Sequence, residues 1–328
     1  MGGRSSEREI SLSSARAVIE GLDPGSYDVR EIEIGADGRW QLPCPAARVE
    51  LGPAGASLPV PVNGEVEQLG EIDVVFPVLH GPFGEDGTVQ GLLELAGVAY
   101  VGAGVTASAL AMDKDLFKSV MRDKGIPVAR SATFRAGDEV ESPYGLPCVV
   151  KPARLGSSVG ISVVRREEDL GPAVDLAFAH DEKILVEEFV AGVEVECSVL
   201  GNADPIASVP GEIVPLASGW YDYEAKYAEG GMELVIPPRI PGEAAERVRE
   251  LAVDAFVASD CEGMARVDFF VLPDGNVLVS ELNTIPGFTA TSVYAKLFEA
   301  SGIPYPELLD RLVALAIERR DRRERLRY

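Results

Sequence analysis

Positive charge is scarce in this chain. Its 328 residues include 30 lysines and arginines against 53 aspartates and glutamates, which gives a formal net charge of -23. Nucleic acids and anionic membrane surfaces bind to basic stripes, so this shortage argues against both as partners. Any phosphate ligand must therefore be met by a few local lysines.

Closely spaced cysteines are also missing. The four cysteines, Cys44, Cys148, Cys197 and Cys261, show no C-x-x-C spacing. This pattern excludes the usual zinc motifs and does not form a disulfide framework. We expect free thiols and a reducing, cytoplasmic environment.

Long apolar runs are limited to one uncharged stretch of eighteen residues, from Leu95 to Met112. Its length is at the lower edge of a membrane span, but it is rich in Gly, Ala, Ser and Thr. We interpret it as a strand, a turn and the start of a helix. The first residues also lack the pattern of a signal peptide.

The length and composition predict two or three packed units. A chain of 328 residues, 46% of them hydrophobic, is too long to fold around one ordinary hydrophobic core. Residues 1–102 alternate apolar strands with a helix, which indicates an open α/β domain. Residues 103–187 place glycines and serines between apolar strands. Residues 188–328 hold a polar aromatic loop, an amphipathic helix and a hairpin. The predicted fold class is α/β, or α+β overall, in three domains.

The first domain begins without an expected strand. Apolar residues at helical spacing predict its first helix: Ala15, Val18, Ile19 and Leu22. The chain enters this helix directly from Met1-Gly2-Gly3, whereas such an entry normally follows a buried strand. We therefore expect a sheet short of one strand, and hypothesise that the start is truncated or that its initiation codon was chosen too late.

A hairpin is predicted around Pro273-Asp274-Gly275-Asn276, because Asp-Gly between β-branched and aromatic runs favours a tight turn. With Asp-Gly as the loop, paired residues have numbers that sum to 549. Asp268 then lies opposite Glu281, and Arg266 opposite Asn283. Strand alternation places all four on one face.

The opposed carboxylates of Asp268 and Glu281 need compensation. Two carboxylates about 4 Å apart repel by about 4 kcal/mol at an effective dielectric constant of about 20. A bound metal ion would remove this repulsion. The alternative is that Arg266 neutralises the pair in a purely structural network.

A second motif is the loop Gly156-Ser157-Ser158-Val159-Gly160, which follows Lys151 at the end of a predicted strand. Its amides and hydroxyls could fold over phosphates. It has neither the Walker A sequence nor G-x-G-x-x-G, so a plain Gly-Ser turn is the alternative. Together with an oxygen-rich Asp/Glu/Asn face, however, it suggests magnesium that carries nucleotide phosphates.

These segments resemble the ATP-grasp ligases, and closely resemble the D-alanine:D-alanine ligases, over essentially the whole chain. The matching segments are GGRSSEREISLSS, VLHGPFGEDGTVQGLLELAGVAYVGAGVTASALAMDK, VVKPARLGSSVGISVV, YDYEAKY, ARVDFF and ELNTIPGFTATS. The resemblance implies a three-domain ATP-grasp fold and a cytoplasmic homodimer that makes D-alanyl-D-alanine for peptidoglycan.

The resemblance also implies an ATP site. The residues that would bind ATP phosphates or their loop are Lys114, Lys151, Ser158 and Lys226. Those that would line the adenosine pocket are Glu187, Phe189, Val190 and Glu194. Two magnesium ions, for which manganese can substitute, would be held by Asp268, Glu281 and Asn283.

The implied substrate site binds two D-alanine molecules. Glu7 would bind the ammonium of the first, with His80 nearby, although His80 alone could be a packing residue. The second carboxylate would lie by Ser292 and Val293. Negative charge on the acyl group would be met by Arg266 and the amide of Gly287.

Ser157 and Tyr227 would complete a hydrogen-bond network with Glu7, and Tyr227 favours a dipeptide product. Tyr221 and Tyr223 could merely pack a lid. Two alternative functions remain open: ligation of D-alanine to D-lactate or D-serine, and a non-catalytic ATP-binding regulator.

Overall fold

The computed structural model describes residues 1–5, 7–38, 40–41, 59–62, 65–68, 72–215 and 232–327. The predicted site residues Lys226 and Tyr227, and also Tyr221 and Tyr223, lie outside these ranges. Among the helices in the described ranges, none is both long and apolar enough to cross a membrane.

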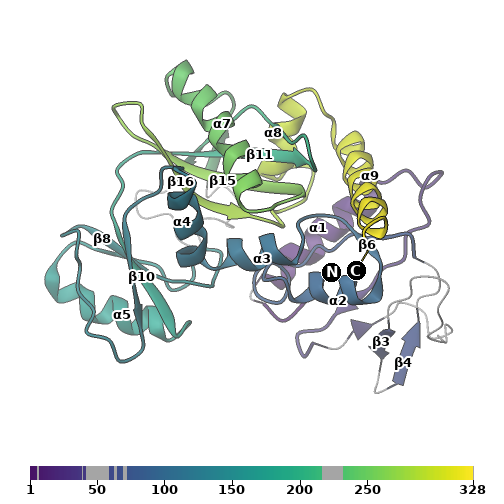
Figure 1. The fold of residues 1–328 in the computed structure, drawn as a ribbon, viewed down its shortest axis with the longest axis horizontal. Coiled ribbons are helices and arrows are strands. Elements are labelled where there is room, and N and C mark those ends of the chain that lie inside the picture. The colour runs from purple at the N-terminus through teal and green to yellow at the C-terminus, as the bar shows by residue number, and fades with distance from the viewer. Residues whose placement is uncertain are drawn as a thin grey trace.

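The described residues of the N-terminal part form helices and short strands (Figure 1). Its elements are α1 (Arg8–Gly21), β1 (Glu33–Ile34), β2 (Trp40–Gln41), β3 (Pro59–Val62), β4 (Glu65–Gln68), β5 (Val74–Val75), α2 (Thr88–Ala96), β6 (Ala99–Tyr100) and α3 (Val105–Met112). β5 and β6 pair in parallel. The uncharged run Leu95 to Met112 thus contains a helix end, a strand, a turn and a helix, and the prediction of a strand, a turn and a helix start within it is confirmed.

The first residues run beside β1. Gly2 forms a parallel bridge with Ile34, and the ammonium of Met1 donates to the carbonyl of Ile32 at 2.9 Å. Burial lowers the pKa of this ammonium to about 6. A mostly apolar cavity of about 510 Å³ adjoins it, lined by residues of the extended segments 28–34 and 72–79 and of α1, α2 and α9. The missing strand stays a prediction, and the cavity offers a place to test it.

The central sheet has the order β7-β10-β8-β9, with every pair antiparallel. It consists of β7 (Ser131–Arg135), β8 (Cys148–Pro152), β9 (Ser162–Val164) and β10 (Lys183–Glu188). The short helix η1 (Glu167–Asp169) leads into α5 (Leu170–Phe178), which packs on this sheet. β8 is buried along its whole length, as its apolar sequence predicts.

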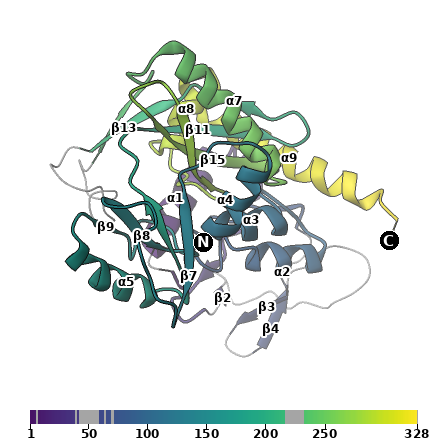
Figure 2. The ribbon, with the colours of Figure 1, turned by 60° about the vertical axis from the view of Figure 1, so that its left-hand side comes forward.

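The largest sheet has the order β14-β13-β11-β15-β16, with β12 paired to β11. Its strands are β11 (Val193–Gly201), β12 (Ile206–Ala207), β13 (Gly211–Pro215), β14 (Met232–Val235), β15 (Gly263–Val271) and β16 (Val277–Asn283). In the part of the chain that the structure describes, they are accompanied by α7 (Gly242–Ala258), α8 (Val293–Ala300) and α9 (Tyr305–Glu324). Figure 2 shows α9 extending away from the sheets toward the C-terminus.

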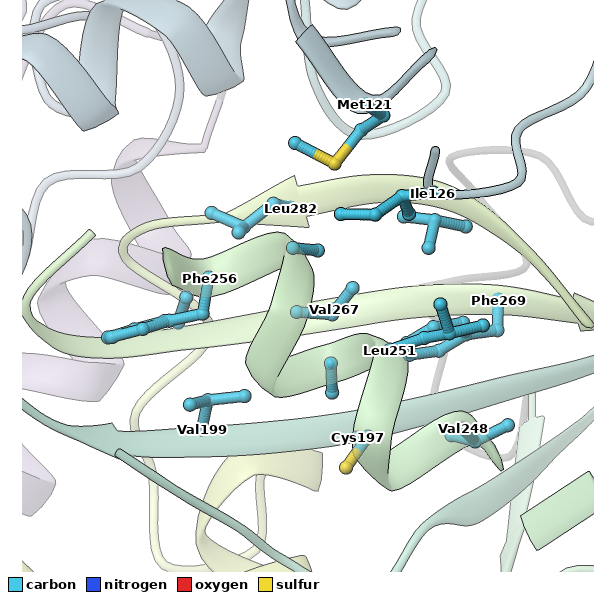
Figure 3. Packing of buried hydrophobic residues seen from close by; sticks show 14 of the residues in the cluster. Met121, Ile126, Cys197, Val199, Val248, Leu251, Phe256, Val267, Phe269 and Leu282 are labelled. Carbon is cyan, nitrogen blue, oxygen red and sulfur yellow. The ribbon is translucent and has the colours of Figure 1, made fainter. Parts of the chain in front are cut away.

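The core of this part lies between α7 and one face of the sheet. Alternate residues of the strands, among them Val199 and Val267, face Leu251 and Phe256 of α7 (Figure 3). Met121, from α4 (Lys114–Asp123), joins the same cluster beside Leu282. The helix α4 is therefore packed against the edge of the large sheet, and Figures 1 and 2 show it between that sheet and the central one.

The predicted hairpin exists, but its turn differs from the prediction. Near the turn, Val271 pairs with Val277 instead of Leu278, because the loop holds three residues instead of two. A register shift follows between Asp268 and Phe269. It accommodates one extra residue in β16 and restores the predicted pairs Asp268 with Glu281 and Arg266 with Asn283.

Candidate active site

The acidic hairpin surrounds one arginine. The guanidinium of Arg266 donates two hydrogen bonds of 2.7 Å to Asp268 and lies 2.9 Å from the carboxylate of Glu196 on β11. Asn283 donates to Asp268 at 3.1 Å. Burial opposes the charge of Arg266, but Asp268 and Glu196 outweigh it and raise its pKa well above the usual value. The alternative to a metal site was that Arg266 neutralises the acidic pair in a purely structural network. Its contact with Asp268 is present in the structure.

Glu196 was missed by the sequence analysis. It pairs with Asp268 across β11 and β15, so it faces the same side of the sheet. The alternation of glutamate with apolar residues in the strand sequence VEVECSV was the available signal.

The donor set of the hairpin suits magnesium. Asp268, Glu281 and Asn283 offer hard oxygen atoms on one face, which is the ligand chemistry that magnesium prefers. Within the described residues, no group of three or more His, Cys, Asp or Glu could hold a metal by itself. Phosphate oxygens and water would therefore have to complete the coordination, as is usual for magnesium at nucleotide sites.

Lys114 connects the two sheets. Its ammonium donates to the carbonyl of Leu155, just before the Gly-Ser loop, at 2.6 Å and lies 3.7 Å from Glu281 of the hairpin. Burial and the nearby Lys151 lower the pKa of Lys114, while Glu281 raises it. The structure thus brings a buried lysine, the loop and the acidic face together.

Lys151 and Glu187, from adjacent strands of the central sheet, form an ion pair at 3.1 Å. The other oxygen of Glu187 lies 2.8 Å from Lys118, a fully buried lysine on α4 that sequence analysis missed. Burial works against the charge of Glu187, but Lys151 and Lys118 together lower its pKa. Lys118 carried no signal beyond its spacing of four residues from Lys114.

The Gly-Ser loop reaches the N-terminal helix. The Ser157 hydroxyl donates a hydrogen bond to the carboxylate of Glu7, which is the N-cap residue of α1. Ser157 and Ser158 have φ of +54° and +58°, a left-handed conformation that non-glycine residues seldom adopt. Such backbone orients successive amides toward one side and is common at functional loops.

His80 links α1 to the loop that carries Gly287. Its Nδ1 lies 2.8 Å from the carbonyl of Ile285, and its Nε2 lies 3.4 Å from the Ser14 hydroxyl, which accepts from the amide of Phe288. Burial lowers the pKa of His80. A neutral ring that donates from Nδ1 and accepts at Nε2 satisfies this network.

Glu85, also missed, lies beside this network. Its carboxylate accepts from the amides of Gly81 and Ile285, at 2.7 and 3.1 Å. Burial, followed by the charge of Glu7, raises its pKa to about 8. The stretch GPFGEDG, which directly follows His80 in the sequence, contains this residue.

The remaining predicted residues lie at strand and helix ends. Phe189 and Val190 follow β10, Glu194 lies at the start of β11, and the guanidinium carbon of Arg165 is 5.7 Å from the centre of the Phe189 ring. Ser292 precedes α8 and accepts from the amide of Thr289, close to Gly287, while Val293 is buried as the first residue of α8.

An antiparallel sheet that carries Lys151 and the Gly-Ser loop faces a second sheet that carries Asp268 and Glu281, with Lys114 between them. This is the architecture of the ATP-grasp ligases. The family described as D-ala D-ala ligase N-terminus matches residues 1–103, and its C-terminal counterpart matches residues 120–314. The chain belongs to the D-alanine:D-alanine ligase family.

Individual relatives agree over the full length. The D-alanine--D-alanine ligase of Geobacillus thermodenitrificans (strain NG80-2) is 44% identical over 353 residues, covering 100% of this chain and 96% of the relative. The D-alanine-D-alanine ligase of Coxiella burnetii superposes with a TM-score of 0.86 at 38% identity, covering 98% and 94% of the two chains. The VanG D-Ala:D-Ser ligase of Enterococcus faecalis superposes with a TM-score of 0.83 at 36% identity, covering 96% and 97%.

Proposed function

We propose that this chain joins two D-alanine molecules into D-alanyl-D-alanine and converts ATP to ADP and phosphate. The carboxylate of the first D-alanine attacks the γ-phosphate, and an acyl phosphate forms as ADP leaves. The amine of the second D-alanine then attacks the acyl carbon, and phosphate leaves. The product would be a peptidoglycan precursor made in the cytoplasm.

The observation that carries this proposal is the position of Lys114 between the Gly-Ser loop and the acidic hairpin. The phosphates of ATP need cations on one side and a metal-binding acidic face on the other, and Lys114 contacts both. Lys151 projects from the adjacent β8 and would contact the phosphates too. The adenosine would lie against the β10–β11 connection, beside Phe189, Val190 and Glu194.

Each substrate group has a matching side chain. The Glu7 carboxylate would hold the ammonium of the first D-alanine, with His80 close by. Arg266 and the amide of Gly287 would stabilise negative charge on the acyl oxygen, since preorganised donors at such a position lower the barrier. Ser292 and Val293 would lie by the second carboxylate.

Asp268, Glu281 and Asn283 would hold two magnesium ions, or manganese in their place. When bound, these ions neutralise the transferring phosphoryl group and hold it in position.

Water must be excluded because it hydrolyses an acyl phosphate. The Ser157–Glu7 hydrogen bond already joins the Gly-Ser loop to α1. Closure with the loop that bears Lys226 and Tyr227 would complete the enclosure, and opening would then limit turnover.

The test is ATP-dependent phosphate release with D-alanine, D-serine, D-lactate or L-alanine, with products identified by mass. Release with D-alanine and a D-alanyl-D-alanine product supports the proposal. The similarity to a D-Ala:D-Ser ligase makes D-serine the sharpest competitor. A mixed product with D-serine would assign the second candidate function, and no release with any substrate would favour a non-catalytic regulator.

We also propose a homodimer, without nucleic acid or membrane partners, and light scattering of the purified chain would measure its mass. Tyr227→Phe should change acceptor choice more than phosphoryl transfer. Lys151→Ala should abolish phosphoryl transfer, and unchanged turnover in that variant would remove its assigned role.

A further inference from the structure

Among the lysines of the candidate site that the structure describes, Lys118 is the least accessible. Its relative exposure is 0%, so it cannot reach a ligand in this conformation. It lies one helical turn after Lys114 on α4, which places both on neighbouring positions of one helix face. Phe117 and Met121, also four apart, pack into the large core and fix how α4 is rotated; Figure 3 shows Met121 in that core.

Glu187 is shared between two ammonium groups. One carboxylate oxygen lies 3.1 Å from Lys151 and the other 2.8 Å from Lys118. Both lysines and the glutamate are buried. Burial lowers the pKa of Lys118, while Glu187 raises it, so the charged pair depends on this contact.

This arrangement bears on how Lys151 can bind a phosphate. A phosphate must draw Lys151 away from Glu187, at least in part. A buried carboxylate that loses its only cation is strongly destabilised. Without Lys118, Glu187 would therefore hold Lys151 in place. With Lys118 on its second oxygen, Glu187 stays compensated when Lys151 turns toward the ligand.

We propose that Lys118 is a positioning residue that frees Lys151 for the nucleotide phosphates by keeping Glu187 compensated. The inference rests on the proposed function only in taking ATP as the nucleotide. Lys118 touches neither substrate nor reacting atoms and acts through Glu187.

The experiment measures affinity by calorimetry for a non-hydrolysable ATP analogue and for adenosine, with magnesium and without D-alanine. Lys118→Met should weaken the ATP analogue about tenfold, or about 1.4 kcal/mol, and leave adenosine within about twofold. Lys118→Arg retains the charge and should keep most of the affinity. Adenosine is the matched ligand, because it lacks the phosphates that Lys151 would contact.

A double variant tests whether Lys118 acts through Glu187. In Lys118→Met/Glu187→Gln no carboxylate holds Lys151, so the preference for the ATP analogue over adenosine should recover to within about threefold of the unsubstituted chain. A structural role alone gives no such recovery. If Lys118→Met does not fold, Lys118→Gln, whose amide could donate to Glu187 but carries no charge, takes its place with a smaller expected loss.

Lys183 provides a control for stability. It is a buried lysine of the central sheet, which also carries Lys151, and its ammonium donates a hydrogen bond of 2.6 Å to Asp113. Lys183→Met should lower the melting temperature at least as much as Lys118→Met, without changing the ratio of ATP-analogue to adenosine affinity.

Equal losses for both ligands in Lys118→Met, or no recovery in the double variant, would overturn the inference. Absence of nucleotide binding by the unsubstituted chain would overturn it together with the proposed function. Nucleotide binding with the expected ratios, together with no dipeptide in the separate assay with ATP and D-alanine, would support the role of Lys118 and refute the ligation.

Discussion

The Ser157 hydroxyl donates a hydrogen bond to the Glu7 carboxylate, although 150 positions separate them in the sequence. Glu7 begins α1 and Ser157 lies in the loop between β8 and β9, so this contact joins the N-terminal part of the chain to the central sheet. In the proposed function, this contact would close one side of the substrate site.

Ser157→Ala should loosen this closure. Water would then reach the acyl phosphate more often, so phosphate released per dipeptide should rise above one and dipeptide formation should fall by about ten- to a hundredfold. Parallel assays of phosphate and dipeptide measure both. Ser142→Ala is the control, since Ser142 hydrogen-bonds only locally to Gly145 in the same part of the chain. A one-to-one ratio in Ser157→Ala would argue against a closing role.

Asp268→Asn should raise the magnesium concentration needed for half-maximal turnover and lower maximal turnover by about a hundredfold or more. The change removes one of the two opposed charges and keeps the shape of the side chain. A magnesium titration of the rate measures the effect. Asp274→Asn, in the exposed turn of the same hairpin, should behave like the unsubstituted chain. Equal magnesium requirements in the unsubstituted chain and both variants would mean that Asp268 does not bind the metal.

Glu85 should make stability depend on pH. Its pKa is about 8 in the folded chain against 4.5 in the unfolded chain, so the folded state binds more protons between these values. Stability from this group is therefore present below pH 4.5 and is lost as pH rises through 8. We expect a loss of a few kcal/mol, because a difference of one pKa unit corresponds to about 1.4 kcal/mol.

The measurement is urea unfolding at several pH values for the unsubstituted chain and for Glu85→Gln. The variant cannot ionise, so its free energy of unfolding should fall less between pH 5 and pH 8. Parallel curves for the two chains would mean that Glu85 is ionised throughout this range.

The hairpin shows how much of the site could be predicted from the sequence alone. Alternation and the Asp-Gly turn placed Asp268 opposite Glu281, and the structure has that pair. The register was right only at the site, because a longer loop and a bulge offset one another. The consecutive polar residues Ser280 and Glu281 break the alternation, since the buried residues change from Val279 to Leu282. That break was the local signal of the bulge.

Contacts between distant segments could not be predicted in this way. Lys118, Glu85 and Glu196 acquire their partners from other helices, loops or strands. Their own neighbours in sequence contain no periodicity that identifies those partners. The resemblance to known ligases pointed to Glu7 and Ser157 as a pair, whereas composition and spacing alone did not.

The buried start of the chain offers a further test of stability. Burial lowers the pKa of the Met1 ammonium to about 6 in the folded chain, below the 8.0 that is usual for a chain terminus. The unfolded chain therefore binds more protons between these values, and stability should rise as pH increases from 6 to 8. At pH 7 the folded chain has lost most of this proton while the unfolded chain keeps it, so stability is about 1.4 kcal/mol below its value at high pH.

Four apolar residues added before Met1 would replace this ammonium with an amide and could fill part of the adjoining cavity of about 510 Å³. We expect the melting temperature to rise by a few degrees, and the increase of stability between pH 6 and 8 to disappear. A polar extension of equal length is the control, because it removes the charge without filling apolar space. Equal gains from both extensions would assign the effect to the charge alone. A gain from neither would show that the cavity does not accept a strand, since each added apolar side chain buried there should stabilise the fold.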